Sequence, residues 1–220
     1  RKRPYLSRIH RGIRPLSALQ RSPGIFLLMF LSSAVYAQPS RTVKDPYHLV
    51  DPRIGTAHDG QTYPVVGMPF GMTGWTPETQ PTEAKCLAPY YYKDTRLTGF
   101  RGSHWMSGTC TQDYGSVTLM PEVGRLKVTP EARASRFSHS SEVMSPAFYS
   151  VYLEDYSTKV EMTGTVHAGM LRISFPSQGA HHLLVQPNAR PGQGFVEVRA
   201  AQHEIVGYNP VVRLYQGAGE

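Results

Sequence analysis

The sequence has little cysteine: Cys86 and Cys110 are the two thiols in its 220 residues. So few thiols exclude a disulfide-rich scaffold and the Cys-rich ligand sets of structural zinc sites. A Cys86–Cys110 disulfide would close a loop of about 25 residues and contribute roughly 3 kcal/mol. The spacing alone does not decide between that bond and two separate thiols.

Acidic side chains are missing from residues 1–40, which hold seven of the 23 Lys and Arg residues. The remaining chain is balanced, with 16 basic and 16 acidic side chains. The net charge of +7 therefore belongs to the N-terminal segment. Because the rest carries no basic surplus, we expect no nucleic-acid partner.

A hydrophobic run long enough to cross a membrane is also absent from the sequence. The apolar run at 25–31 falls well short of the roughly 20 residues of a spanning helix, which argues against a membrane anchor. A basic segment, this short run and small residues around Ala37 are typical of a signal peptide. We predict a signal peptide at 1–37, cut after Ala37, no stable membrane insertion, and a secreted, periplasmic or cell-surface protein. The chain starts with Arg1, so we expect its natural start to lie upstream.

Several catalytic motifs are absent from the sequence as well. It has no Gly-Lys-Ser/Thr phosphate loop, no Gly-x-Ser-x-Gly elbow, no twelve-residue calcium loop and no tight His spacing for a transition metal. Asp59, Asp94 and Asp113 are candidate carboxylates for glycoside hydrolysis, which needs a pair about 5–9.5 Å apart. The sequence does not show that two of them face each other, and Asp113 is favoured as a turn cap.

What the sequence does contain is a series of short alternating segments separated by Gly, Pro, Asn and Asp. They lie at 116–120, 124–128, 149–153, 159–166, 170–175, 182–186, 195–198, 204–207 and 211–215. A short strand is expected at 70–75, a turn-rich excursion at 76–81, and a single helical turn at 131–135. The pattern predicts an all-β fold, a large antiparallel β-sandwich over 49–220 that follows a linker at 38–48. Since the last strand lies near Glu220, we expect the domain to be truncated at its C-terminal end.

Three polar loops, at 55–72, 86–94 and 101–113, combine glycines, hydroxyl groups and aromatic rings. This composition suits a carbohydrate, whose hydroxyls need polar partners and whose ring needs an aromatic face. The run Tyr90–Tyr92 has two interpretations: the tyrosines contact a flat polar ligand, or they are core residues whose hydroxyls form hydrogen bonds. Composition favours a place in the core.

Several stretches resemble glycoside hydrolase family 92, a family of exported exo-acting α-mannosidases. They are Val50–Thr56, Gly60–Pro64, Pro69–Met72 and the run from Gly99 to Gly115 with its His104, Ser107-Gly-Thr and Asp113-Tyr-Gly. The stretches Ser135–His139 and Tyr149–Tyr156 continue the resemblance in the same order. The resemblance covers the chain from about Tyr47 to the end.

The resemblance implies an N-terminal β-sandwich followed, in full-length members, by an (α/α)₆ barrel. It implies a secreted, inverting, Ca²⁺-dependent exo-α-mannosidase, expected to be α-1,2-specific, that removes terminal mannose from mannose-containing glycans such as N-glycans. The general acid, the base and the calcium ligands would belong to the barrel. The present chain alone is therefore expected to be inactive, and the C-terminal barrel to be its partner.

The resemblance assigns this chain walls of the terminal-mannose subsite and no catalytic or metal-binding residue. The implied substrate-binding residues are Gly55, Thr56, Asp59, Gly60, Cys86, Tyr90, Tyr92, Arg101, His104, Trp105, Ser107, Gly108 and Thr109. Gln61, Val65–Val66 and Trp105–Met106 depart from the family pattern, which leaves the linkage and the leaving group open. The alternative function is a non-catalytic carbohydrate-binding β-sandwich.

Overall fold

The computed structural model describes residues 45–80, 88–103, 116–188 and 194–209. The chain divides into two units, 1–44 and 45–220, and all the described residues belong to the second. The predictions for the signal peptide, for Cys86 and Cys110, for Asp113 and for a strand at 211–215 lie outside the described residues.

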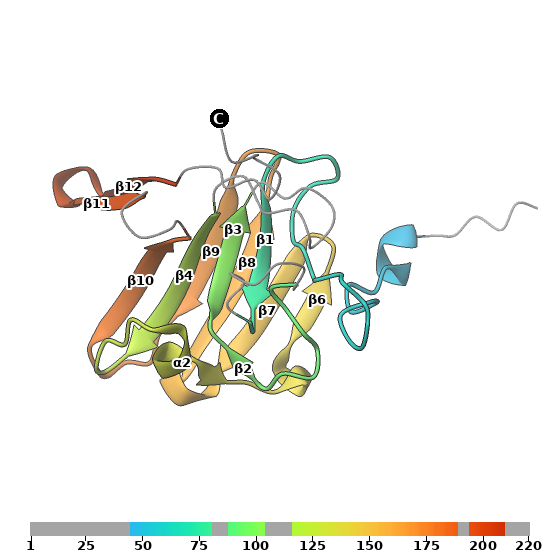
Figure 1. The fold of residues 1–220 in the computed structure, drawn as a ribbon, viewed down its shortest axis with the longest axis horizontal. Helices are drawn as coiled ribbons and strands as arrows, with labels where there is room; N and C mark the ends of the chain where they lie inside the picture. Colours follow the sequence, from blue (N-terminus) through green and yellow to red (C-terminus); the bar gives the residue numbers. More distant parts are fainter. Residues whose placement is uncertain (1–44, 81–87, 104–115, 189–193, 210–220) are drawn as a thin grey trace, which may run out of the picture. The chain divides into compact units, whose positions relative to one another are not determined.

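Two four-stranded antiparallel sheets form the described domain, one behind the other in Figure 1. The first has the order β1 (Gly74–Glu78), β3 (Gly99–Ser103), β4 (Ser116–Val123) and β10 (His181–Pro187). The second runs β6 (Val143–Ser145), β7 (Phe148–Leu153), β8 (Thr158–Gly164) and β9 (Gly169–Ser174). The predicted antiparallel β-sandwich is thus confirmed.

Smaller elements complete the described part of the chain. Two short antiparallel pairs join β2 (Arg96–Leu97) to β5 (Ser135–Arg136) and β11 (Phe195–Arg199) to β12 (Glu204–Tyr208). Four 3₁₀ turns lie at η1 (Pro46–Leu49), η2 (His139–Ser141), η3 (Glu154–Tyr156) and η4 (Ala200–Gln202). The Tyr47 hydroxyl in η1 donates to Ser145 Oγ over 2.6 Å, so this segment contacts β6.

The predicted helical turn is confirmed as α2 (Pro130–Arg133). Thr129 caps it, because the Thr129 side chain accepts a hydrogen bond from the Ala132 N–H. Pro130 occupies the first turn, where a missing N–H costs no hydrogen bond.

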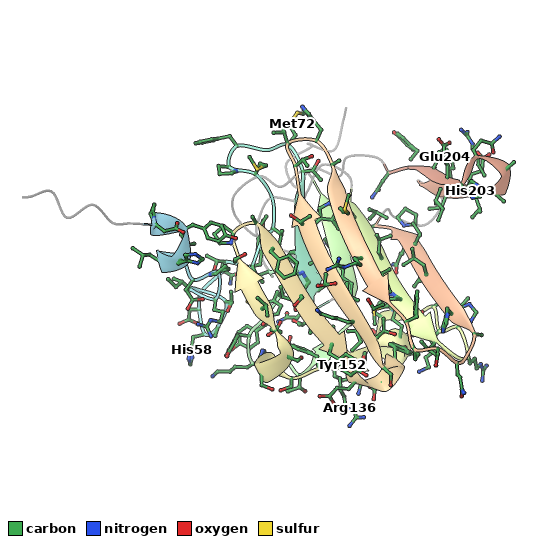
Figure 2. The ribbon with its side chains drawn as sticks, turned by 180° about the vertical axis from the view of Figure 1, so that it is seen from behind. His58, Met72, Arg136, Tyr152, His203 and Glu204 are labelled. Carbon is green, nitrogen blue, oxygen red and sulfur yellow. The ribbon has the colours of Figure 1, made fainter. Side chains whose placement is uncertain are left out.

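The hydrophobic core lies between the sheets and follows from strand alternation. Tyr149, Val151 and Leu153 of β7 point inward, whereas Tyr152 points outward on the face seen in Figure 2 and is 42 % exposed. Trp75 of β1 packs over Gly102 of β3 and Gly169 of β9. A Cβ at either glycine would lie within 2.7 Å of the indole, so these two positions require the absence of a side chain.

The opposite face of the first sheet, away from Trp75, carries a buried polar network. Arg101 Nε and Thr118 Oγ1 both donate to Glu78 Oε2, over 2.9 and 3.0 Å. Arg133 of α2 is 1 % exposed and donates to the carbonyls of Thr98 and Val128. Burial lowers the pKa of the Arg133 guanidinium. This network anchors α2 on the sheet.

Three local predictions were wrong. The polar loop expected at 101–113 begins as a strand, because residues 101–103 belong to β3. The segment 124–128 is not a strand, because Gly124 turns the chain with a φ of +88° and the Lys127 N–H is held by Glu122 Oε2. The strand expected at 70–75 begins at Gly74 and continues through the expected turn as far as Glu78. Pro77 is tolerated there because β1 is an edge strand.

Candidate functional site

The glycine-rich loop that begins at Val50 is closed by short-range hydrogen bonds. The Thr62 N–H donates to the Gly55 carbonyl over 3.2 Å, and the Thr62 hydroxyl to the Ile54 carbonyl over 2.5 Å. Gly55 has a φ of +78°, and a Cβ at Gly60 would lie 2.2 Å from the Gly55 carbonyl oxygen. Both positions therefore require glycine.

An ion pair lies at the start of this loop. Arg53 Nε and Nη2 donate to the two carboxylate oxygens of Asp51 over 2.8 and 2.7 Å, and the Arg53 backbone N–H adds a third bond. These hydrogen bonds lower the pKa of Asp51 to about 2 and raise the pKa of Arg53. Both side chains remain partly exposed, so the pair presents fixed donors and acceptors to solvent.

The tyrosine segment Tyr90–Tyr92 is held against the glycine-rich loop. The Tyr92 N–H donates to the Thr56 carbonyl over 2.8 Å, and the Thr56 hydroxyl donates to the Arg53 carbonyl. The Tyr91 N–H is bound by Thr79 Oγ1 over 2.9 Å. Two loops that are far apart in sequence therefore meet through Thr56 and Tyr92.

Tyr90 is fully buried, and its hydroxyl donates to the Glu142 carboxylate. The Tyr149 hydroxyl of β7 donates to the same carboxylate over 2.5 Å. His139 Nδ1 lies 2.5 Å from Glu142 Oε2. The Glu142 side chain, 2 % exposed, thus joins the tyrosine segment to η2 and β7.

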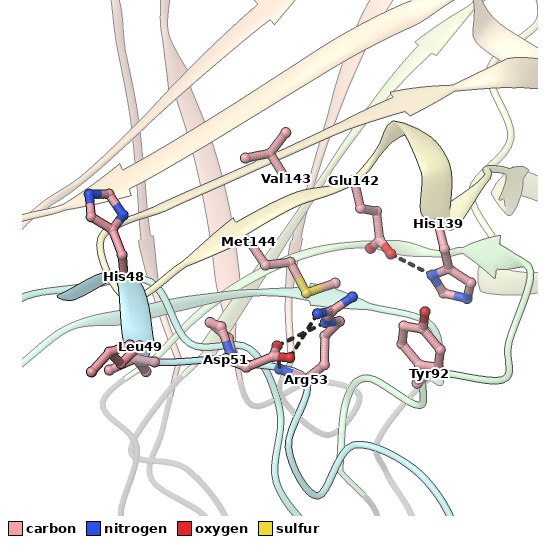
Figure 3. A pocket seen from close by; sticks show the side chains of 11 residues that line it. His48, Leu49, Asp51, Arg53, Tyr92, His139, Glu142, Val143 and Met144 are labelled. Carbon is pink, nitrogen blue, oxygen red and sulfur yellow. Dashed lines mark hydrogen bonds and ion pairs between the residues drawn. The ribbon is translucent and has the colours of Figure 1, made fainter. Parts of the chain in front are cut away.

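The ring of Tyr92 stacks on the imidazole of His139, with centroids 4.1 Å apart and planes 17° apart. Both rings line a pocket of about 420 Å³, shown in Figure 3. Its lining combines polar, aromatic and thioether side chains and comes from His48, Leu49, Val50, Asp51, Pro52, Arg53, Tyr92, His139, Glu142, Val143 and Met144. This volume falls within the range of small-molecule sites.

The residues expected to contact sugar do not all gather at this pocket. Tyr92 lines it, and Thr56 is buried and accepts the Tyr92 N–H at its carbonyl. Gly55 and Gly60 shape the loop, and Asp59 is exposed on it.

Two other expected residues are buried and use their polar groups inside the domain. Tyr90 is bonded to Glu142, and Arg101 lies on the first sheet with Glu78. The remaining expected contacts, Cys86, His104, Trp105, Ser107, Gly108 and Thr109, lie outside the described residues.

Sequence reasoning missed several residues of the pocket: Asp51, Arg53, His139, Glu142 and Met144. His139 and Glu142 are three positions apart in a 3₁₀ turn and its C-cap, a spacing that places their side chains together. This His-x-x-Glu spacing begins at the last residue of the family-like stretch Ser135–His139 and is visible in the sequence.

No metal site is evident in the described residues. In that part of the chain, no three His, Cys, Asp or Glu side chains gather in a way that could hold a metal ion. The described residues therefore do not fit a calcium site of their own. Among the helices of the same residues, none combines the length and the apolar character needed to cross a membrane.

The fold and sequence are similar to those of larger glycosidases. An inverting mannosidase of family GH92 from Bacteroides thetaiotaomicron is 28 % identical, with a TM-score of 0.67 over 77 % of this chain and 23 % of its own. A GH92 α-mannosidase from the same bacterium is 31 % identical, with a TM-score of 0.56 over 63 % of this chain and 20 % of its own. An uncharacterized secreted glycosidase of Arthroderma benhamiae is 26 % identical over 170 residues.

This chain spans about a fifth of the length of these relatives, 21 % in the case of the Arthroderma protein. Residues 49–218 match the family model of the glycosyl hydrolase family 92 N-terminal domain. That match covers most of the chain and includes every element that forms the two sheets. The chain belongs to glycosyl hydrolase family 92, of which it carries the N-terminal domain.

Proposed function

We propose that this chain is the N-terminal domain of an exported, Ca²⁺-dependent, inverting exo-α-mannosidase that removes terminal, α-1,2-linked mannose from glycans. The observation that carries the proposal is the family match over residues 49–218. Its support is that two similar solved structures belong to GH92 mannosidases, one of them inverting. Export is supported by the signal pattern in 1–37 and by the secreted Arthroderma relative.

The role proposed for this domain is to hold the terminal mannose rather than to cleave its bond. The loop at 55–60 and the ring of Tyr92 form one continuous structure, because the Thr56 carbonyl accepts the Tyr92 N–H. Together with Cys86 and the stretch 104–109, they would form walls of the mannose subsite. An aromatic ring beside fixed hydrogen-bonding groups is the chemistry that recognises a pyranose.

The bond-cleaving carboxylates and most calcium ligands are proposed to lie in an (α/α)₆ barrel of the same full-length protein. Calcium would supply contacts to the mannose hydroxyls. This chain's residues would orient the ring and exclude water from one side of it.

Mannose release from an aryl α-mannoside tests the proposal. The full-length protein should release mannose and lose activity when calcium is chelated, whereas residues 38–220 alone should show no turnover. Turnover by residues 38–220 would contradict the placement of the carboxylates, and an inactive full-length protein would contradict the function.

A second candidate function is a carbohydrate-binding β-sandwich that works without a catalytic partner. It is favoured by one observation: the described residues alone form the pocket of about 420 Å³. Calorimetric titration of residues 38–220 with methyl α-mannoside distinguishes the two functions, because only an independent binding module should bind the sugar unaided.

A further inference from the structure

Glu142 lies between η2 and β6 and binds three side chains from separate segments. Its carboxylate accepts the Tyr149 hydroxyl over 2.5 Å and the Tyr90 hydroxyl over 3.1 and 3.3 Å. Its third partner is His139 Nδ1, at 2.5 Å. The side chain is 2 % exposed, so these contacts replace nearly all of its hydration.

The two tyrosines act as fixed donors to this carboxylate. Burial, followed by the charge of Glu142, raises the pKa of both Tyr90 and Tyr149. Both hydroxyls therefore keep their protons and can point them at Glu142. Two buried donors from different parts of the chain leave the carboxylate little freedom to rotate.

The third contact leads from Glu142 to the pocket. His139 is held at Nδ1 by the carboxylate, and the edge-to-face contact with Phe137, at 5.1 Å and 87°, limits the tilt of its ring. The face of the imidazole stacks on Tyr92, which lines the pocket. The position of Tyr92 thus depends on His139, and the position of His139 depends on Glu142.

We propose that Glu142 is a positioning residue for sugar recognition: it fixes the His139–Tyr92 stack that forms one wall of the pocket. The inference rests on the proposed function, because only that function gives the pocket a sugar ligand. Glu142 acts through two other rings, and its effect should appear in the binding of substrate rather than in the cleavage step.

The test uses the full-length protein and measures kcat and KM on an aryl α-mannoside. Glu142→Gln keeps the size of the side chain but cannot accept all three hydrogen bonds. We expect KM to rise about tenfold with kcat nearly unchanged, as for a weakened aromatic contact outside the reacting bond. Glu161→Gln is the matched control: Glu161 lies on the outer face of β8, paired with Lys159 and Arg172, and should leave KM unchanged.

His139→Phe provides a second route if Glu142→Gln folds poorly, because a phenyl ring can still stack on Tyr92 but cannot bond to Glu142. It should also raise KM. The double variant should raise KM no further than either single variant, since both break the same link.

The outcomes separate the inference from the proposed function. A purely structural role would lower the folded fraction, and therefore the apparent kcat, without changing KM. Unchanged KM in both single variants, or additive effects in the double variant, would overturn the positioning role while the mannosidase function stands. A wild-type protein without α-mannosidase activity would overturn both.

Discussion

The Tyr92 ring lies parallel to the His139 imidazole, 4.1 Å away, where the tyrosine segment meets the 3₁₀ turn before β6. We expect Tyr92→Ala to lower kcat/KM of the full-length protein on an α-mannoside, since it removes an aromatic contact surface. The corresponding loss of transition-state stabilisation should be about 1–3 kcal/mol. Tyr92→Phe retains the stack and should lose much less activity. Steady-state kinetics and thermal unfolding should be measured together, because a loss of stability in Tyr92→Ala that accounts for its whole loss of activity would make Tyr92 a packing residue.

The glycine-rich loop gives a second prediction. Gly60→Ala places a Cβ 2.2 Å from the Gly55 carbonyl oxygen, so the loop must shift at a cost of roughly 1–3 kcal/mol. Because this loop is a proposed wall of the subsite, KM should rise as well. Gly124→Ala is the control: its φ of +88° costs about 1–2 kcal/mol, but its Cβ meets no heavy atom within 4 Å. A KM that is the same in both variants would argue against the loop as a sugar contact.

Glu122 gives a pH-dependent prediction. The residue is fully buried, Oε2 accepts the Lys127 N–H, and Oε1 has no hydrogen-bond partner among the described residues. Burial raises the pKa of this carboxyl above its usual value of 4.5, despite the opposing charges of Arg133, Lys127 and His182. Because the folded state holds the proton more tightly, stability falls as pH rises from the unfolded to the folded pKa.

Glu122→Gln removes this charge, so its stability relative to wild type should improve as pH rises above about 4.5. Thermal unfolding of both proteins between pH 4 and pH 8 measures the difference. A variant that becomes relatively less stable with rising pH would show that the attraction between Glu122 and Arg133 exceeds the cost of burial.

Three strands of the second sheet, β7 to β9, could be predicted because local alternation and burial agree there. Val151 and Val160 face the core while Tyr152 and Lys159 face solvent, so a period of two is visible in the sequence. The segment 124–128 also alternates, yet it is a turn. The hydrogen bond from the Lys127 N–H to Glu122 competes with strand pairing. A pattern of alternating apolar residues does not indicate such a side-chain hydrogen bond.

The pocket was harder to predict than the sheets. Tyr90 and Tyr149 both donate to the Glu142 carboxylate, from which they are 52 and 7 residues away in sequence. These contacts form only when the loops fold onto β7. The prediction from composition that the run Tyr90–Tyr92 lies in the core is confirmed for Tyr90. The sequence could not single out Arg53 or His139, because their roles arise from Asp51, Tyr92 and Glu142 around them.

The main proposal is that this family 92 domain belongs to an inverting α-mannosidase. The most direct measurement is a proton NMR time course of an aryl α-mannoside with the full-length protein, recorded before mutarotation mixes the anomers. We expect β-mannose to appear first and the α-anomer later. Initial release of α-mannose, or no release of mannose, would contradict the account.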